Sequence, residues 1–209
     1  MKLLVFGASG PTGRLLVTQA LEQGHEVTAF VRRPEAFELR HERLRAARGD
    51  TKYDPTSVAE AVRGQDAVVS ALGLGNVFIP NRFMARSVGN IIPALEQANV
   101  KRFVLMSSFG VGESIKDAPL LSAIAFRTLL AAVFADKHEG EEALRRSRLD
   151  WTIVRPVALT NAPLSGRYRA GERLELHGLP TISRADVAHF MLGEVAAARY
   201  QGKAVVLSS

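Results

Sequence analysis

Cysteine is absent from the 209 residues of the chain, and this absence excludes several kinds of chemistry. Without a thiol there is no disulfide, no thiolate nucleophile and no cysteine-ligated metal or iron–sulfur cluster. No Gly-x-Ser-x-Gly elbow for a serine nucleophile is present either. The five histidines show no metal-ligand spacing, and His189 lies in an apolar segment where we expect it to be a core residue. The sequence therefore predicts no metal and no nucleophile–base catalysis.

Long hydrophobic runs are also missing. Gly7 and Gly10 interrupt the apolar N-terminus before a signal peptide could form. The most apolar later segment, residues 120–134, contains Arg127 and is shorter than the roughly 20 residues that a bilayer span requires. Whether it lines a substrate cleft, packs in the core or forms a dimer contact stays open. We expect a cytoplasmic protein without a membrane partner, as a monomer or homodimer.

The charge balance is basic without being clustered. Lys and Arg number 27 against 21 Asp and Glu, which gives a formal net charge of +6. Such a charge favours anionic partners, but the arginines are scattered and no nucleic-acid-binding motif is present. We therefore predict no nucleic-acid partner and expect a phosphorylated cofactor and a small-molecule substrate.

Short apolar runs alternate with amphipathic segments along the whole chain. The predicted strands are 2–6, 26–31, 44–48, 67–72, 102–107, 151–155, 169–175 and 204–207. The predicted helices are 12–24, 55–63, 82–99, one or two within 118–148, and 184–197. Alternating strands and helices imply parallel pairing. The fold class is α/β, a single Rossmann-type doubly wound parallel sheet with helices on both faces. We expect residues 1–209 to form a single domain, in which about 108–185 form the substrate cleft.

A glycine-rich turn joins the first strand to the first helix. In this context Gly-x-x-Gly-x-x-Gly is the fingerprint of dinucleotide binding. Gly7 permits the tight turn, Gly10 lets the backbone approach the pyrophosphate, and Gly13 lets the helix pack closely on the strand. The phosphates would then lie on the free amides of the helix N-terminus. The predicted cofactor contacts here are Gly7, Ser9, Gly10, Pro11, Thr12 and Gly13.

The end of the second strand distinguishes between the two nicotinamide cofactors. An NAD site places Asp or Glu there, to accept from the ribose 2′-hydroxyl. This chain has Arg32 and Arg33 instead, and guanidinium groups match phosphate geometry. We therefore predict NADP(H) in preference to NAD(H). The alternative is that both arginines are solvated loop residues.

Three later strand ends add further candidates at the same edge of the sheet. Asp50 and Thr51 follow the third strand beside the expected adenine, although Asp50 also suits a turn cap. Leu72 and Gly73 follow the fourth strand, where glycine allows close approach to the cofactor. Ser107 ends the fifth strand and would face the nicotinamide or the substrate, unless it only caps the strand.

These motifs together resemble the atypical short-chain dehydrogenase/reductase superfamily, in its NmrA-like or NAD(P)H-binding group. The residues that carry the resemblance are the glycine turn, Val31-Arg32, Gly49-Asp50, Gln65-Asp66-Ala67-Val68, Met106-Ser107-Ser108 and the Trp-Thr-Ile-Val-Arg-Pro run at 151–156. The C-terminal motifs at 163–168 and 182–192 are similar to the biliverdin-IXβ reductase and NADPH-dependent flavin reductase group. The resemblance implies cofactor contacts at Gly10, Thr12, Gly13, Arg32, Asp50, Leu72, Gly73 and Ser107. It also implies hydride transfer from NADPH to a flavin or tetrapyrrole.

The sequence departs from this superfamily at two places. An ordinary short-chain dehydrogenase uses Tyr-x-x-x-Lys, but Val133 stands four residues before Lys137. Reductases of the implied group also carry pocket histidines where this chain has Lys137 and Ala158, so biliverdin itself is a doubtful substrate. Lys137 is a candidate catalytic residue, with Ser107, that could attract an anionic flavin phosphate. Alternatively, Lys137 faces solvent and pairs with Glu141 at i,i+4 spacing.

The sequence thus predicts an NADPH-dependent oxidoreductase that reduces a flavin, a quinone or a similar planar conjugated acceptor. Such an acceptor can take its proton from water, so the missing tyrosine agrees with this chemistry. One alternative is an NADP(H)-binding redox sensor without turnover. Others are an epimerase or carbonyl reductase of the same superfamily, or a scaffold with a relic cofactor site.

Overall fold

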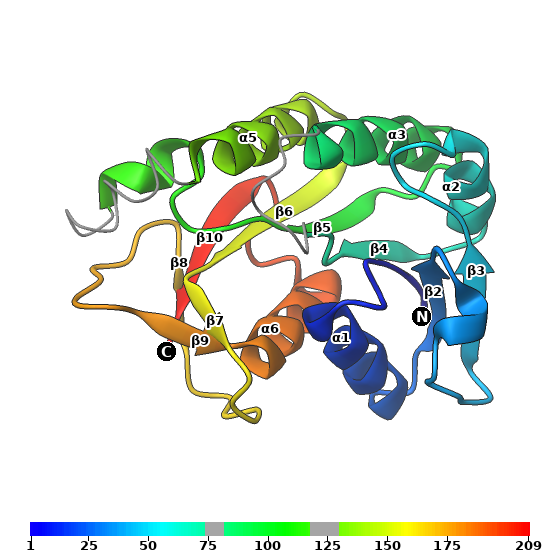
Figure 1. The fold of residues 1–209 in the computed structure, drawn as a ribbon, viewed down its shortest axis with the longest axis horizontal. Helices are drawn as coiled ribbons and strands as arrows, with labels where there is room; N and C mark the ends of the chain where they lie inside the picture. The colour runs from blue at the N-terminus through cyan, green and yellow to red at the C-terminus, as the bar shows by residue number, and fades with distance from the viewer. Residues whose placement is uncertain (74–81, 118–129) are drawn as a thin grey trace.

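The structure, a computed structural model, is described here for residues 1–73, 82–117 and 130–209. Its main element is an eight-stranded sheet in the order β3-β2-β1-β4-β5-β6-β10-β8 (Figure 1). Its strands are β1 (Lys2–Phe6), β2 (Glu26–Val31), β3 (Leu44–Arg48), β4 (Ala67–Ser70), β5 (Arg102–Met106), β6 (Asp150–Pro156), β8 (Arg169–Gly171) and β10 (Lys203–Ser208). The order reverses at β1, between β2 and β4, and such a switch point is where α/β sheets bind their ligands.

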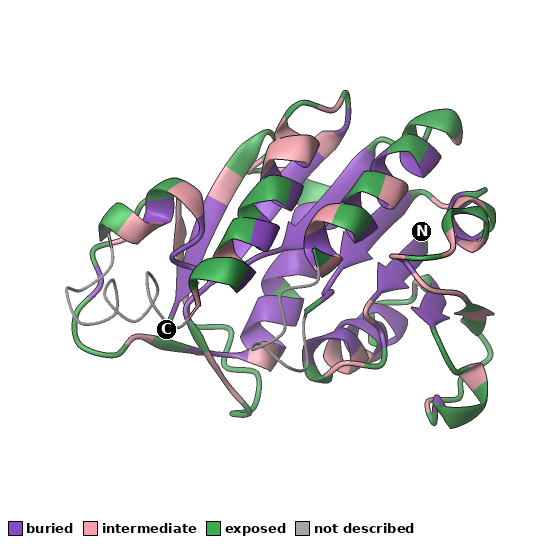
Figure 2. Cartoon of the chain, turned by 45° about the horizontal axis from the view of Figure 1, so that its top comes forward, coloured by how far each residue is buried: buried purple, intermediate pink, exposed green. Residues whose placement is uncertain are grey.

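Helices cover both faces of this sheet. On one face lie α1 (Pro11–Glu22) and α6 (Arg184–Ala197), and on the other lie α2 (Pro55–Val62), α3 (Phe83–Gln97) and α5 (Ala131–Arg145) (Figure 1). Two short 3-10 helices, η1 (Pro34–Ala36) and η2 (Gly112–Asp117), lie in loops. The central strands are buried between the two layers, while the outer helix faces are exposed (Figure 2). The expected Rossmann-type architecture is therefore confirmed.

One part of the fold prediction is wrong, because the sheet is not wholly parallel. Strand β8 pairs antiparallel with β10, Val206 opposite Gly171. Parallel neighbours need a crossover connection, usually a helix. No helix between β6 and β8 carries the chain back across the sheet, so β8 runs opposite to β6 and to β10, which is parallel to β6. The predicted strand at 169–175 also ends early, at Gly171.

A second, two-stranded sheet was not predicted. It pairs β7 (Ala158–Thr160) with β9 (Thr181–Ser183) in parallel. Three residues are too few to show a hydrophobic period, so neither strand could be predicted from the apolar pattern.

His189 is not the core residue that its apolar helix suggested. The side chain is exposed, and its Nδ1 lies 2.8 Å from the hydroxyl of Tyr168. In the apolar segment 120–134, residues 120–129 lie outside the described part, and Val133 is buried in α5. Among the described residues, no helix is long and apolar enough to cross a membrane.

Candidate cofactor site and acceptor cleft

A cleft of about 680 Å³ opens at the carboxyl ends of the central strands. It crosses the switch point, from the end of β3 to the end of β5. Predicted cofactor residues in its lining are Gly7, Ser9, Gly10, Pro11, Thr12, Arg32, Asp50, Thr51, Leu72 and Gly73. The structure thus brings four separate strand ends to one hollow, while Gly13, Arg33, Ser107 and Lys137 do not line it.

The glycine turn owes two of its glycines to the packing of the protein itself. Gly7 has φ +74°, and a Cβ there would lie 2.7 Å from the carbonyl oxygen of Ala71. A Cβ on Gly13 would lie 2.0 Å from the carbonyl oxygen of Gly7, so no side chain fits at this position. Gly13 therefore serves helix–turn packing, and it does not line the cleft.

The N-terminus of α1 is free to bind an anion. Gly10 is the N-cap, no side chain caps the helix, and Pro11 occupies the first turn. Free first-turn amides and the helix dipole favour phosphate groups. The turn is therefore compatible with the pyrophosphate of a dinucleotide.

Arg32 lies at the cleft wall, at the end of β2, where an NAD site would hold a carboxylate. Both Arg32 and Arg33 are exposed, and neither forms an ion pair with the described residues. Only Arg32 lines the cleft, so the two arginines are not equivalent.

The corner after β3 serves the protein as well as the cleft. Asp50 accepts backbone hydrogen bonds from Lys52 and Tyr53 at 2.8 and 3.1 Å, so its predicted alternative role as a turn cap is present. The hydroxyl of Thr51 lies 2.9 Å from that of Ser87. Asp50 and Thr51 both line the cleft, but each already uses part of its hydrogen-bonding capacity within the protein.

Gly73 differs from the glycines of the turn. A Cβ at Gly73 would meet no described atom within 4 Å. Because Gly73 lines the cleft, a side chain there would extend into the cleft instead of packing against other residues. The neighbouring residues 74–81 lie outside the described part of the chain.

Lys137 and the serines after β5 form a polar corner. Lys137 is only 9% exposed, so the expectation that it faces solvent is wrong. Its amine donates to the carbonyl oxygen of Ser107 at 3.2 Å and to the hydroxyl of Ser108 at 2.6 Å. Glu141, its expected partner, pairs with Arg155 instead. Burial lowers the pKa of Lys137 to about 8, although Glu141 and Asp136 attract its charge.

Ser107 was expected to face the nicotinamide or the substrate, but it does not line the cleft. Its side chain is 2% exposed, and its hydroxyl has no hydrogen-bond partner among the described residues. Ser108 is only half-buried, and its hydroxyl is the one that Lys137 contacts. The sequence predicted the first serine of the pair as a candidate, and the hydroxyl that Lys137 contacts is that of the second.

The polar corner adjoins the cleft through two neighbours. Met106, directly before Ser107, lines the cleft. Asp136, directly before Lys137, accepts from the amides of Met84 and Ala85, both at 2.9 Å. These contacts hold α5 against the start of α3, where Phe83 lines the cleft.

The sequence prediction missed several lining residues, namely Phe30, Val31, Gly49, Ala71, Phe83, Met106, Leu159 and Arg184. Most of them are sequence neighbours of predicted residues, so the strand ends that identified the predicted residues could have identified these as well. Arg184 begins α6 after the unpredicted strand β9, and its Nη1 donates to Asn161 at 2.7 Å. It is a second cation in the cleft lining. Among the described residues, no cluster of three or more acidic or histidine side chains could hold a metal.

Comparison with known proteins places this geometry in a family. The family model described as NAD(P)H-binding matches residues 7–198. A chloroplastic protein of Arabidopsis thaliana, At2g34460, is 32% identical over 173 residues, which are 79% of this chain and 61% of that protein. The chain thus spans about three fifths of this relative.

Two further proteins are similar over nearly the whole chain. The uncharacterized sugar epimerase YhfK of Bacillus subtilis is 27% identical over 93% of this chain and 88% of its own length. The solved structure of ChuY, an anaerobillin reductase of Escherichia coli O157:H7, has a TM-score of 0.81. It is 25% identical and covers 99% of this chain and 96% of its own. With its cleft at the switch point and its glycine turn, the chain belongs to the NAD(P)H-binding family of atypical short-chain dehydrogenases/reductases.

Proposed function

We propose that the protein is an NADPH-dependent reductase that transfers hydride to a flavin, a quinone or a similar planar conjugated acceptor. The observation that carries this proposal is the composition of the cleft. The phosphate-binding turn and Arg32 form one part of it, and the apolar side chains of Phe83, Met106 and Leu159 form another. Apolar and aromatic side chains suit a flat ring system.

The missing tyrosine supports an acceptor of this kind. Val133, one helical turn before Lys137, is buried and has no proton to give. A carbonyl or sugar substrate needs an acid at the reacting oxygen, whereas a conjugated ring spreads the charge it receives. This observation weighs against an epimerase or carbonyl reductase, despite the similarity to YhfK.

Within the mechanism, the protein mainly binds and positions. A bound nicotinamide would supply the hydride. The turn at Gly7–Gly13 and the start of α1 would hold the pyrophosphate, and Arg32 would hold a 2′-phosphate. Phe83, Met106 and Leu159 would orient the acceptor and exclude water. Lys137, with a pKa of about 8, is mostly protonated at neutral pH, and Ser108 can pass on its proton.

Two measurements test the proposal. Isothermal titration with NADPH and NADH should give tighter binding of NADPH, and equal dissociation constants would contradict the cofactor preference. Steady-state assays with FMN, riboflavin and small quinones should show NADPH oxidation. If none of these acceptors is reduced, the reductase proposal fails.

Val133 also favours one alternative of a different class, an NADP(H)-binding redox sensor. Such a protein would bind the cofactor tightly and oxidise none of it with any acceptor. Retention of NADP(H) through purification, with no turnover, would support the sensor. The remaining expectations, a cytoplasmic monomer or homodimer without nucleic-acid or membrane partners, are part of this proposal, and cell fractionation and sedimentation would test them.

A further inference from the structure

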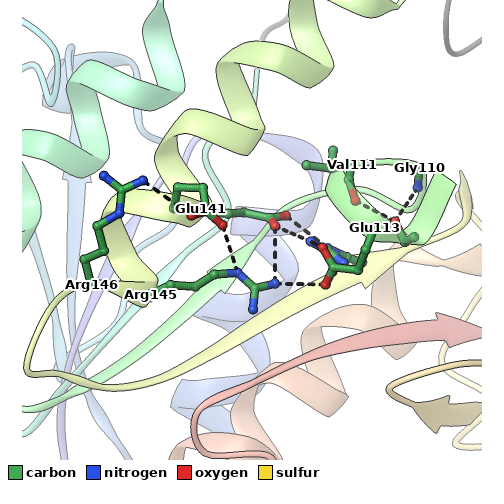
Figure 3. A network of polar contacts seen from close by, with 9 residues as sticks. Gly110, Val111, Glu113, Glu141, Arg145 and Arg146 are labelled. Atoms are coloured by element: carbon green, nitrogen blue, oxygen red, sulfur yellow. Dashed lines mark hydrogen bonds and ion pairs between the residues drawn. The ribbon is translucent and has the colours of Figure 1, made fainter. Parts of the chain in front are cut away.

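Three elements meet at the guanidinium group of Arg155, a buried residue of β6 whose two partners, Glu141 and Glu113, are labelled in Figure 3. Its Nε donates to Glu141 of α5 at 3.1 Å, and its Nη2 also binds the second oxygen of Glu141. On its other side, Nη1 and Nη2 lie 3.0 and 3.2 Å from the two oxygens of Glu113 in η2. Arg155 therefore binds one carboxylate from each of two elements, and both contacts are two-pronged.

The two carboxylates differ in their surroundings. Glu141 is completely buried, whereas the side chain of Glu113 is 58% exposed. Arg145 also contacts Glu113, at 3.1 Å, so two carboxylates face two guanidinium groups. Burial raises the pKa of Glu113, but hydrogen bonds from Arg155 and the backbone, with both arginine charges, lower it to about 2. The network stays ionised at any ordinary pH.

Each carboxylate belongs to an element that carries one half of the polar corner. Glu141 lies one turn after Lys137 on α5. Glu113 lies in η2, which begins at Gly112, four residues after Ser108. The segment between them is braced by Ser114, whose hydroxyl accepts from the amide of Gly110 at 2.9 Å and donates to the carbonyl of Val111 at 2.7 Å.

Close packing leaves little freedom around this network. Gly112 has φ +58°, and a Cβ there would lie 3.1 Å from Nδ1 of His138 and 3.2 Å from Nη2 of Arg155. The backbone of η2 therefore rests against both α5 and β6. Charged groups near Lys137 itself are Glu141 and Asp136, and Asp136 is held by the amides at the start of α3.

We propose that Arg155 is a positioning residue, which holds α5 and residues 107–117 in one register and so keeps the Lys137 amine against Ser107 and Ser108. This role in catalysis rests on the proposed reductase function, but its geometric part can be measured in the free protein. Arg155 does not line the cleft, and its ion pairs among the described residues are with Glu141 and Glu113, so it acts through these two carboxylates.

The variant Glu113→Gln tests the proposal, because it weakens the exposed contact and leaves the buried pair of Arg155 and Glu141 intact. Glu142→Gln is the matched control, since Glu142 lies on α5 and its ion pairs among the described residues are with Arg145 and Arg146. Hydrogen exchange measures the amides of Gly110, Val111 and Ser114. Acylation of lysines as a function of pH, followed by mass spectrometry, gives the pKa of Lys137.

In Glu113→Gln we expect roughly fivefold faster exchange of these amides, the size expected for one partly exposed ion pair. The pKa of Lys137 should rise from about 8 towards the ordinary value, because a looser corner admits water. Glu142→Gln should change neither quantity. Arg155→Lys keeps the charge but loses the planar fork, and should reproduce the effects of Glu113→Gln.

If Glu113→Gln matches its control in both exchange and acylation, the positioning role is wrong, whether or not Arg155→Lys folds. Turnover is a separate measurement. A wild-type protein that reduces no acceptor would overturn the proposed function, while exchange and acylation would still decide the role of Arg155. For an active enzyme, Glu113→Gln should lower kcat more than it changes KM for the cofactor.

Discussion

The two parts of the candidate site are built in different ways. The cofactor part begins with one continuous turn, Gly7–Gly13, whose residues are fixed by backbone geometry. The polar corner at Lys137, together with the Arg155 network beside it, combines side chains from the β5 end, η2, α5 and β6, which are fixed by charge and burial. Local backbone rules hold the first together, and contacts between distant parts of the chain hold the second. Variants of the two parts should therefore fail differently.

The largest effect is expected at Gly13. In Gly13→Ala the new Cβ would lie 2.0 Å from a backbone oxygen, so the turn must deform, at a cost of roughly 3 kcal/mol or more. Gly89→Ala is the control, since Gly89 is an exposed residue of α3 with open space around its Cβ position. It should stabilise the protein by about 0.5–1 kcal/mol. Urea unfolding measures the free energy of unfolding of both variants. If Gly13→Ala is as stable as Gly89→Ala, the turn is not held by backbone geometry.

A smaller effect is expected at Arg32, within the cofactor part. Loss of a charge-assisted contact to phosphate, about 1.5–3 kcal/mol, should weaken NADPH binding roughly 10- to 100-fold in Arg32→Ala. NADH binding should change little. Arg33→Ala is the control, because Arg33 is equally exposed but does not line the cleft. Titration of both cofactors against both variants measures this, and a larger loss in Arg33→Ala would assign the 2′-phosphate to the other arginine.

The pH dependence separates the polar corner from the cofactor part. If Lys137 supplies the proton, kcat should fall about tenfold per pH unit above pH 8, whereas the Kd for NADPH should not follow that transition. The free energy of unfolding should rise with pH over the range in which kcat falls. The folded pKa of Lys137 lies below its unfolded value, so the unfolded chain binds more protons between about pH 8 and 10.5.

Folding stability should therefore rise with pH across this window in the wild type relative to Lys137→Met. Denaturant unfolding at pH 7, 8, 9 and 10 measures the difference. A rate that is flat through pH 8 to 10 would mean that water supplies the proton.

The smallest effect is expected at Arg184, which is half-buried in the cleft lining. If its free guanidinium nitrogens attract an anionic substituent of the acceptor, FMN should be reduced with a KM several-fold lower than riboflavin. Arg184→Gln should abolish this difference and leave NADPH affinity unchanged. A parallel loss of NADPH affinity would instead assign Arg184 to the cofactor.

The difference between the cofactor part and the polar corner also explains what could be predicted from the sequence. Continuous apolar runs define strands, and the bounds of β1, β2, β3 and α6 were predicted without error. The glycine turn and the strand ends carry short motifs with a backbone cause. They identify most of the cofactor lining because parallel strands bring their carboxyl ends to one edge.

The polar corner could not be predicted in this way. Lys137 and Arg155 are buried only because Ser108, Glu141 and Glu113 supply partners from other elements. The i,i+4 spacing from Lys137 to Glu141 suggested a surface pair, but tertiary contacts gave the carboxylate to Arg155 instead. Similarly, the short strands β7 and β9, and with them the place of Arg184, depend on pairing that no local pattern records.

The antiparallel strand β8 has a consequence for the solubility of the protein. Without it, β10 would be the last strand, and its buried run at 205–207 would present unpaired backbone groups to any neighbouring chain. Open apolar edges of this kind promote aggregation. The opposite edge, β3, is already guarded by the exposed Arg45 and Arg48. Strand β8 pairs with Val206–Ser208 of β10 and leaves a three-residue strand as the edge, and very short edge strands are one way in which proteins limit pairing with other chains.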